Sequence, residues 1–385
     1  MVYARFSNFE FPISSFHFQG QGLDNLTHTL TAVALSQAGL SRKTRFATLA
    51  VIAGANLPDI DVVTWTRDTT TYLQYHRGLT HSLLGVAGLG ALAGAVIYYL
   101  GRHAAPKASA GAANLCWLVV CGLAGVASHL LLDFTNSYGV RPFLPFSGRW
   151  YAWDIMFIVD PLLLFLLVAG LGIPALLRLM SEEMGARKPG YRAGAMVALA
   201  AMALLWGLRD LAHRRVLSLL DSHTYARENS RRVGAFPAPG NPFAWTGVVE
   251  TDSAFHVVAA GALDDDVNVD DAEVFRKPEP GPALGAARQT RTAGVFLGFA
   301  RFPWSDTQEH ETGYSVTWRD LRYASLGTER RGFVVDVELD KTLRVLSESF
   351  SFTGAPRPAG LQGSPAGEEE SATPGEADAR PASHR

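Results

Sequence analysis

The chain has 385 residues, of which 48% are hydrophobic and only 18% are charged, a balance that argues against an ordinary soluble enzyme. The formal net charge is -2, so the chain has no basic excess to hold nucleic acid, and we expect no nucleic-acid partner. The two cysteines are too few for a disulfide framework or a zinc site made of thiolates.

The chain begins with a stretch that lacks the basic start, apolar core and cleavage site of a signal peptide, and we interpret residues 1–22 as an N-terminal extension. Residues 25–39 and 43–57 then predict a helical hairpin. The second arm is apolar but too short to cross a bilayer alone, so it either enters the membrane or lies against it.

Four longer apolar runs follow, namely Leu83–Leu100, Leu115–Leu132, Ile155–Leu177 and Ala193–Leu208. Runs of about 20 apolar residues span a bilayer core, whereas the buried helices of soluble proteins are usually shorter and striped. A large helical globule is the alternative, but the glycines in the first two runs suit close helix packing in lipid. We therefore predict a helical membrane domain over residues 23–215 with about four transmembrane helices.

After the last run the composition changes to short alternating segments that are broken by Pro and Gly. Residues 216–239 are interpreted as a linker and residues 240–353 as a small soluble β-rich domain. Residues 354–385 are rich in Pro, Gly and Ala and predict a disordered tail. The predicted fold class is an α-helical membrane bundle, made of the hairpin and the transmembrane helices, followed by a β-rich domain.

Side chains of the types that bind metal ions lie close to the ends of the helical segments. If successive runs cross the membrane in alternating directions, these side chains reach the same side, whereas His103 lies in a loop on the opposite side. Taken singly, each one has an ordinary alternative as a helix cap, a turn residue or a hydrogen-bonded histidine. Ionisable groups at membrane depth are costly, which favours a joint role. The predicted metal ligands are His28, Asp59, Asp61, His76, His81, His129 and Asp133.

Four segments that contain these residues resemble the YdjM-like family of membrane-bound metal-dependent hydrolases, which are described as LexA-regulated inner-membrane proteins. The resemblance covers roughly residues 23–215. It implies a kinship with zinc-dependent phospholipase C and related zinc nucleases, and hence a phosphoester hydrolase. The segments are Asp24-Asn25-Leu26-Thr27-His28, Pro58-Asp59-Ile60-Asp61, His76-Arg77-Gly78-Leu79-Thr80-His81-Ser82 and His129-Leu130-Leu131-Leu132-Asp133.

The expected cofactor is a divalent metal, with zinc preferred, manganese or iron as alternatives, and room for two or more ions. Arg77 is predicted to act in catalysis by clamping a phosphate, with an ordinary interfacial cation as the alternative, and Asp61 is predicted to be catalytic as well as a ligand. Arg141 and Arg149 have the same two readings as Arg77. For Asp154 we prefer a helix cap over a ligand or a residue that orients one.

The function predicted from these observations is hydrolysis of a phosphoester in a lipid or lipid-linked substrate by metal-activated water. Cleavage of an amide or acyl ester is the nearest rival reaction, since the same cluster would polarise a carbonyl. The alternative class is a non-enzymatic membrane protein, either a transporter or a scaffold whose β-rich domain binds a partner.

The distribution of cations predicts the orientation of the chain in an inner membrane. Site-side loops carry four, Arg67, Arg77, Arg141 and Arg149, or seven if Arg209, Arg214 and Arg215 are included. By the positive-inside rule, the site and the β-rich domain then lie on the non-cytoplasmic face. The nine cations of the opposite loops are Arg42, Lys43, Arg45, Arg102, Lys107, Arg178, Arg187, Lys188 and Arg192.

Overall fold

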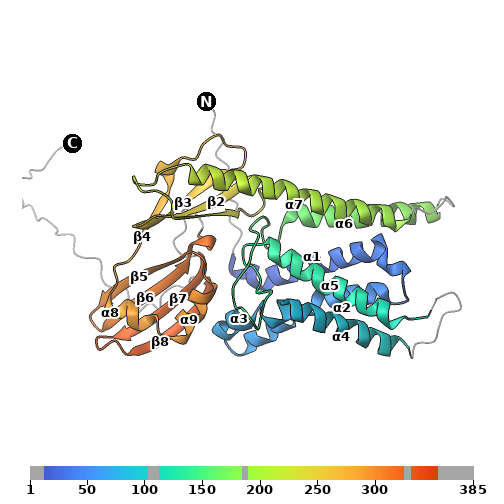
Figure 1. Cartoon of the computed structure of the whole chain (residues 1–385), viewed down its shortest axis with the longest axis horizontal. Coiled ribbons are helices and arrows are strands. Elements are labelled where there is room, and N and C mark those ends of the chain that lie inside the picture. The colour runs from blue at the N-terminus through green and yellow to red at the C-terminus, as the bar shows by residue number, and fades with distance from the viewer. Residues whose placement is uncertain (1–12, 103–111, 184–189, 325–330, 354–385) are drawn as a thin grey trace, which may run out of the picture. The chain divides into compact units, whose positions relative to one another are not determined.

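The helices of the N-terminal half lie side by side in a computed structural model, which describes residues 13–102, 112–183, 190–324 and 331–353 (Figure 1). The predicted hairpin is present, although its first helix begins at Ile13, inside the stretch interpreted as an extension. The helices are α1 (Ile13–Ala38), α2 (Ala47–Asn56), α3 (Thr69–Tyr75), α4 (Leu83–Gly101), α5 (Leu115–Thr135), α6 (Pro161–Glu183) and α7 (Tyr191–Asp221), with short 3-10 segments η1 (Leu40–Arg42), η2 (Pro58–Thr66) and η3 (Leu79–His81).

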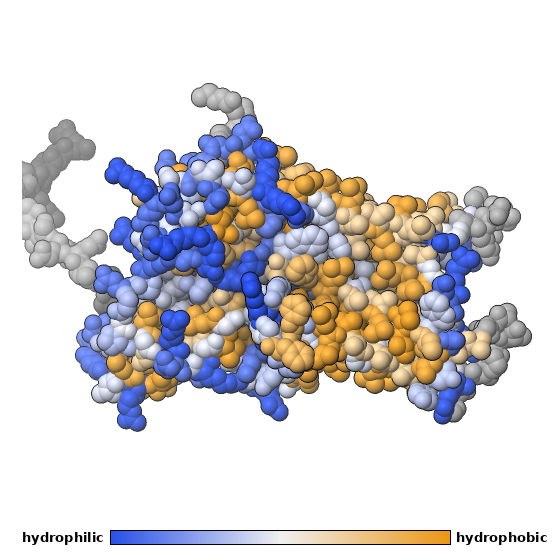
Figure 2. Space-filling model, viewed as in Figure 1, coloured by the Kyte–Doolittle hydropathy of each residue, from blue (hydrophilic) through white to orange (hydrophobic). Residues whose placement is uncertain are grey.

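Within the described residues, four helices are long and apolar enough to cross a membrane, namely α4, α5, α6 and α7. Figure 2 shows a hydrophobic belt around these helices, with hydrophilic residues on the sheets and at the far helix ends. Large apolar side chains on the belt are exposed, among them Leu92, Phe165 and Val197. A surface of this kind is stable only in lipid, so the predicted membrane bundle is confirmed.

Backbone contacts between α2, α4 and α5 hold the first half of the bundle together. A Cβ atom on Gly54 would lie 2.4 Å from the carbonyl oxygen of Gly122, and one on Gly122 would lie 2.2 Å from that of Gly90. Glycine is required at both positions because any side chain would force the helices apart. This approach also brings the carbonyl of Ala55 to His129, which belongs to the candidate site.

Gly122→Val should therefore lower the stability of the bundle by about 3 kcal/mol or more, since overpacking against backbone cannot be relieved by a rotamer change. Thermal unfolding in detergent measures the effect. Gly88→Val is the matched control, because no atom lies within 4 Å of a Cβ built at Gly88 on α4. Equal melting temperatures for the two variants would contradict the packing described here.

The C-terminal part contains two antiparallel sheets of four strands each in the described residues. The alternation that predicts strands around Val316 and Val337 is observed, since these two residues are paired and buried on β6 and β7. The first sheet consists of β1 (Arg232–Pro237), β2 (Ala244–Glu250), β3 (Ala254–Gly261) and β4 (Glu273–Arg276); helices α8 (Pro282–Ala287) and α9 (Arg291–Phe299) precede β5 (Pro303–His310), β6 (Gly313–Asp320), β7 (Arg331–Asp340) and β8 (Val345–Thr353).

The segment interpreted as a linker, residues 216–239, is structured. It contains the end of α7 and strand β1, so the boundary predicted at residue 240 falls inside the first sheet. Val216 and Leu220 on α7 pack into one core with Trp245 on β2, which extends the helix beyond the membrane run. The predicted tail, residues 354–385, lies outside the described residues.

The second sheet packs against the segments that surround the candidate site. Tyr72 on α3 and Tyr138 after α5 share one hydrophobic core with Phe333 and Phe352. The hydroxyl group of Thr69 donates to the carbonyl oxygen of Phe350 at 2.8 Å. The loops that present the site are therefore supported from the sheet side.

Two acidic residues before α6 have different roles from those predicted. Asp160 caps the helix, because its carboxylate accepts from the backbone N–H groups of Leu162 and Leu163, and it also pairs with Arg209. Asp154 was predicted to be the cap, but it forms a two-point ion pair with Arg301, at 2.7 and 3.0 Å. The helix begins seven residues later, at Pro161, where the fixed φ angle of proline favours a first turn.

Candidate metal centre

The candidate site is built from segments that are far apart in the sequence and meet at one end of the bundle. His28 lies on α1, and His129 and Asp133 lie four residues apart on one face of the last turns of α5. Asp59 lies in η2 and His81 in η3, the two short segments that follow α2 and α3. The convergence predicted from alternating helix directions is therefore observed among the described residues.

Four donor atoms form a tight cluster at the centre of this site. Nε2 of His81 lies 3.0 Å from Nε2 of His129, and both lie 3.5 Å from Oδ1 of Asp59. Oδ2 of Asp133 lies 3.2 Å from His81 and 3.3 Å from His129. Four ligands about 2.0–2.1 Å from a zinc ion in tetrahedral geometry would be about 3.3 Å apart, so the cluster has the dimensions of a metal cage.

The outer nitrogens of the two histidines determine which atoms face the cluster. Nδ1 of His129 lies 2.7 Å from the carbonyl oxygen of Ala55, which can only accept, so Nδ1 carries the proton. Nδ1 of His81 faces the Thr80 hydroxyl at 2.9 Å and the Asp61 carboxylate at 3.3 Å. Both Nε2 lone pairs therefore point into the cluster, an arrangement that requires a cation between them.

Asp61 lies behind His81, and its oxygens are occupied by protein donors. It accepts from Nδ1 of His76 at 2.8 Å, from the backbone N–H of Arg77 at 3.0 Å and from the Thr80 hydroxyl at 2.8 Å. Asp61 and His76 are adjacent to the donor cluster rather than within it. This geometry favours a supporting role in which Asp61 fixes the His81 ring, and ligation by either residue stays a prediction.

Asp61→Asn should weaken metal binding by about 10–100-fold without abolishing it, as expected for a residue that orients a ligand. Metal titration of the purified protein in detergent measures the dissociation constant. Asp270→Asn is the matched control, because Asp270 is an exposed residue of the soluble domain. If Asp61→Asn removed metal as completely as Asp133→Asn, Asp61 would itself be a ligand.

Arg77 is enclosed by protein acceptors rather than open to a substrate. Its guanidinium contacts Asp133 at 2.9 Å, donates to the side chain of Asn136 at 3.0 Å and lies over the Tyr138 ring. Its backbone φ of 51° is in the left-handed region, which a non-glycine residue adopts where its surroundings demand it. These contacts favour a role in holding Asp133, and the predicted phosphate clamp stays a prediction.

The site carries an excess of negative charge. Four buried or half-buried carboxylates, Asp24, Asp59, Asp61 and Asp133, face one guanidinium, so three negative charges remain when the histidines are neutral. Burial disfavours protonation of His81, but its contacts with Asp133, Asp59 and Asp61 outweigh burial and raise the pKa of His81 well above its usual range. Burial likewise raises the pKa of Asp24 despite the opposing influence of His28. The site therefore binds cations, whether protons or metal ions.

Sequence reasoning missed several residues of this site. Asp24 was quoted as part of a motif but not predicted to be a ligand, although it lies one helical turn before His28 on α1 and 3.6 Å from its Nε2. The i, i+4 spacing of Asp24 and His28 is the same signal that identified His129 and Asp133, and it could have found Asp24. Thr80 and Asn136 carry no comparable signal, because their roles depend on contacts between distant segments.

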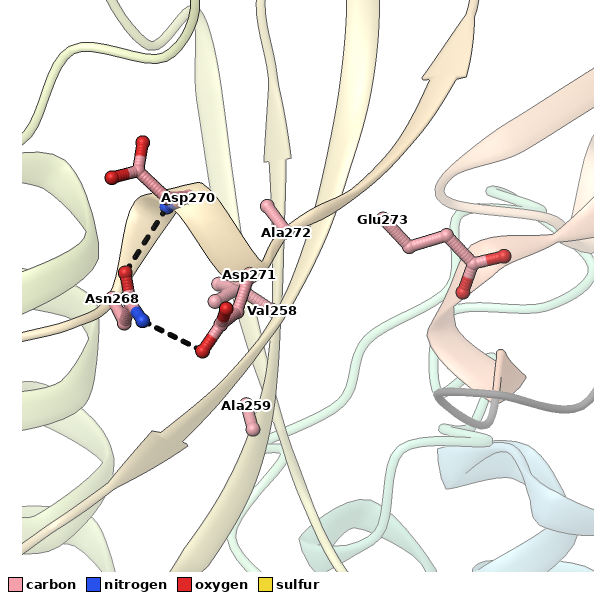
Figure 3. Close-up of a pocket in the computed structure, with 7 residues that line it drawn as sticks. All are labelled: Val258, Ala259, Asn268, Asp270, Asp271, Ala272 and Glu273. Carbon is pink, nitrogen blue, oxygen red and sulfur yellow. Dashed lines mark hydrogen bonds between the residues drawn. The ribbon is translucent and has the colours of Figure 1, made fainter.

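Other candidates lie away from the cluster. The guanidinium of Arg141 donates to the backbone carbonyls of Gln74 and His76, and that of Arg149 lies over the Tyr151 ring. His103 lies outside the described residues. Figure 3 shows a pocket beside β3 and β4, in which the Asn268 side chain bonds to Asp270 and Asp271. The seven residues that line this pocket include none of the candidate metal donors.

Comparison with known proteins places these observations in a family. A family model described as YdjM inner membrane protein matches residues 23–215, half of the chain, and this range includes every candidate donor. The chain belongs to the YdjM inner membrane protein family. The family description and the four apolar helices together show that this YdjM-family chain is an integral inner-membrane protein. The predicted resemblance is thus confirmed, while the description states a location and no reaction.

The C-terminal part also matches a known domain. Residues 282–354 match a model described as the YfhP C-terminal alpha/beta plait domain, which covers α8, α9 and the second sheet. The uncharacterized protein YfhP of Bacillus subtilis (strain 168) is 25% identical over 333 residues, which cover 85% of this chain and 90% of that protein. No solved structure matches the chain. The similarity to YfhP therefore extends through both the helical part and the sheets.

Proposed function

We propose that this YdjM-family protein is a metal-dependent hydrolase that cleaves a phosphoester in a lipid or lipid-linked substrate. The proposal rests on one observation above all, the pair of Nε2 atoms of His81 and His129 that lie 3.0 Å apart and face Asp59 and Asp133. A divalent ion bound by these donors supplies Lewis-acid chemistry and lowers the pKa of water from about 15.7 towards about 7. Zinc suits a donor set of two imidazoles and two carboxylates.

The residues around the donors have roles that follow from their contacts. Asp61 and Thr80 fix the His81 ring, and the Ala55 carbonyl fixes the His129 ring, so both histidines present Nε2. Arg77 holds Asp133 and offsets part of the negative charge. Prearranged donors of this kind need little reorganisation when the substrate binds.

The location of the donors supports an amphiphilic substrate. Asp59 is the most accessible of the four donors, with 22% of its side chain exposed, whereas the other three are almost completely buried. The apolar side chains that follow it in η2 are exposed, with Ile60 at 58% and Val63 at 62%. A substrate that approaches Asp59 therefore meets a hydrophobic surface beside the metal donors, which suits a lipid tail.

The reaction can be tested with purified, metal-loaded protein in detergent. The protein is offered phospholipids, a soluble phosphodiester and a nucleic acid, with Asp133→Asn as the inactive control. We expect a phosphate-containing product from the phospholipid and none from the control.

Two results would overturn the assignment of substrate or reaction. Turnover of the nucleic acid alone would contradict the lipid substrate. Release of fatty acid without a phosphate-containing product would move the protein to the acyl-ester class.

The site and the sheets are proposed to lie on the non-cytoplasmic face, because nine cations lie in the opposite loops and the site side has fewer free ones. Of the site-side cations, Arg77 and Arg209 are buried in ion pairs. We expect Ser253→Cys, exposed on the first sheet, to react with a membrane-impermeant maleimide in intact cells, in a chain whose native cysteines are replaced by alanine. Ser41→Cys, in the turn between α1 and α2, is the matched control and should be protected. The reverse labelling pattern would reverse the topology.

A further inference from the structure

His28 is a buried histidine that the first donor cluster does not use. Its side chain is 1% exposed, and among the described residues neither ring nitrogen has a hydrogen-bond partner. The ring stacks on His129 with centroids 3.8 Å apart, which fixes its plane. A buried polar group without a partner costs about 1–3 kcal/mol, so an imidazole held in this way implies a ligand that satisfies it.

Two carboxylate oxygens face the free Nε2 atom of His28. Oδ1 of Asp24 and Oδ1 of Asp133 each lie 3.6 Å from it. This distance is too long for an N–H···O hydrogen bond, which is about 2.7–3.2 Å. It matches the separation of two ligands that share one ion, because ligands about 2.0–2.2 Å from a metal lie roughly 3–4 Å apart.

Arg77 fixes the two carboxylates in this arrangement. Its Nη2 atom lies 3.5 Å from Oδ2 of Asp24 and 2.9 Å from Oδ1 of Asp133. Asp24 thereby keeps Oδ1 directed towards His28. Asp133 directs Oδ2 to His81 and His129 and Oδ1 to His28, so its carboxylate lies between two sets of donors.

We propose that Asp24, His28 and Asp133 form a second divalent-metal site, with Asp133 as the carboxylate that bridges it to the first. The inference deepens the proposed function and rests on it. Paired ions about 3.5–4 Å apart suit in-line displacement at phosphorus, where the attacking and leaving oxygens both need stabilisation. A bridged pair therefore favours a phosphoester over a carboxylic ester as the substrate class.

The test is the metal content of the full chain. Protein in detergent is stripped with a chelator, reloaded with zinc or manganese and analysed for metal per chain. We expect about two ions per chain in the wild type and about one in His28→Ala and in Asp24→Asn, because each variant leaves the first cluster intact. His310→Ala and Asp270→Asn, both in the soluble part, are the matched controls and should keep the wild-type content.

The outcomes separate this inference from the proposed function. Wild-type protein that binds no metal would overturn both. Wild-type protein that binds a single ion would overturn the second site and leave a metal-dependent reaction standing. A full complement of metal in both His28→Ala and Asp24→Asn would show that these residues are not the ligands.

A spectroscopic measurement covers the case in which a variant fails to fold. Manganese-loaded wild-type protein should give the electron paramagnetic resonance signature of two ions coupled through a shared carboxylate. Asp24→Glu, which preserves the carboxylate, should retain part of that coupling, whereas His28→Ala should give the spectrum of an isolated ion. An isolated-ion spectrum from the fully loaded wild-type protein would contradict bridging by Asp133.

Discussion

His129→Ala should bind metal more than about 100-fold more weakly than the wild-type chain, because even partners outside the ligand set cost about 10–100-fold when they are removed. His129 contributes Nε2 to the first cluster, and its ring also supports His28 by stacking. Its removal is expected to damage both donor sets. His81→Ala and Asp133→Ala should have similar effects, and His76→Ala a smaller one, since His76 contacts Asp61 and not the cluster.

Elemental analysis of the purified variants measures this effect, together with circular dichroism to show that the helices remain. His223→Ala is a matched control, because His223 lies after α7 and pairs with Asp266 in the soluble part. The histidine on the opposite loop, His103, serves as a second control. Equal metal content across all of these variants would contradict the assignment of the site.

The sequence predicts the membrane helices and most of the donors for the same physical reason. Apolar runs long enough to cross a bilayer must form helices, because lipid offers no partners for free backbone groups. Once four runs are placed, their ends are fixed in space to within a turn or two. His81 before α4 and Asp133 at the end of α5 then had to lie near each other, and the structure places Nε2 of His81 3.2 Å from Oδ2 of Asp133.

The roles of individual residues were harder to predict, because each role depends on contacts across the fold. Asp61 has the sequence context of a ligand, yet donors from His76, Arg77 and Thr80 occupy its oxygens. Asp154 has the context of a helix cap, yet it pairs with Arg301, which is 147 residues away in the sequence. Periodicity and capping rules describe neighbours within a few positions and carry no information about such pairs.

The start of the first sheet shows the same limit. β1 follows a stretch that contains Arg231 and Arg232 and several polar residues, which is typical of a linker. It is a strand because β2 pairs with it along its whole length, from Arg232 with Glu250 to Pro237 with Trp245. Pairing of this kind overrides local propensity.

The largest stability effect outside the bundle is expected for Arg322→Met. Arg322 and Asp320 form an ion pair at 2.6 Å, and both side chains are completely buried. Removing one member of a buried pair typically costs about 3–5 kcal/mol, because the other charge is left without compensation. We therefore expect a fall in the melting temperature of roughly 10 °C or more, measured by thermal unfolding in detergent.

The double variant Asp320→Asn with Arg322→Met separates the charge effect from simple loss of contacts. It should recover part of the stability, because no uncompensated charge remains in the core. An unchanged melting temperature in Arg322→Met would show that this pair does not hold the second sheet together.

Arg322 also connects the second sheet to the metal centre. One of its nitrogens donates to the carbonyl oxygen of Ser137 at 2.7 Å, four residues beyond Asp133, and another donates to the carbonyl oxygen of Phe299 at 3.0 Å. Loss of this link should free the turn that follows α5 and weaken metal binding as well as stability. The double variant lacks the same link, so it should regain stability without regaining metal affinity. Recovery of both properties together would mean that the sheet stabilises the fold but does not position Asp133.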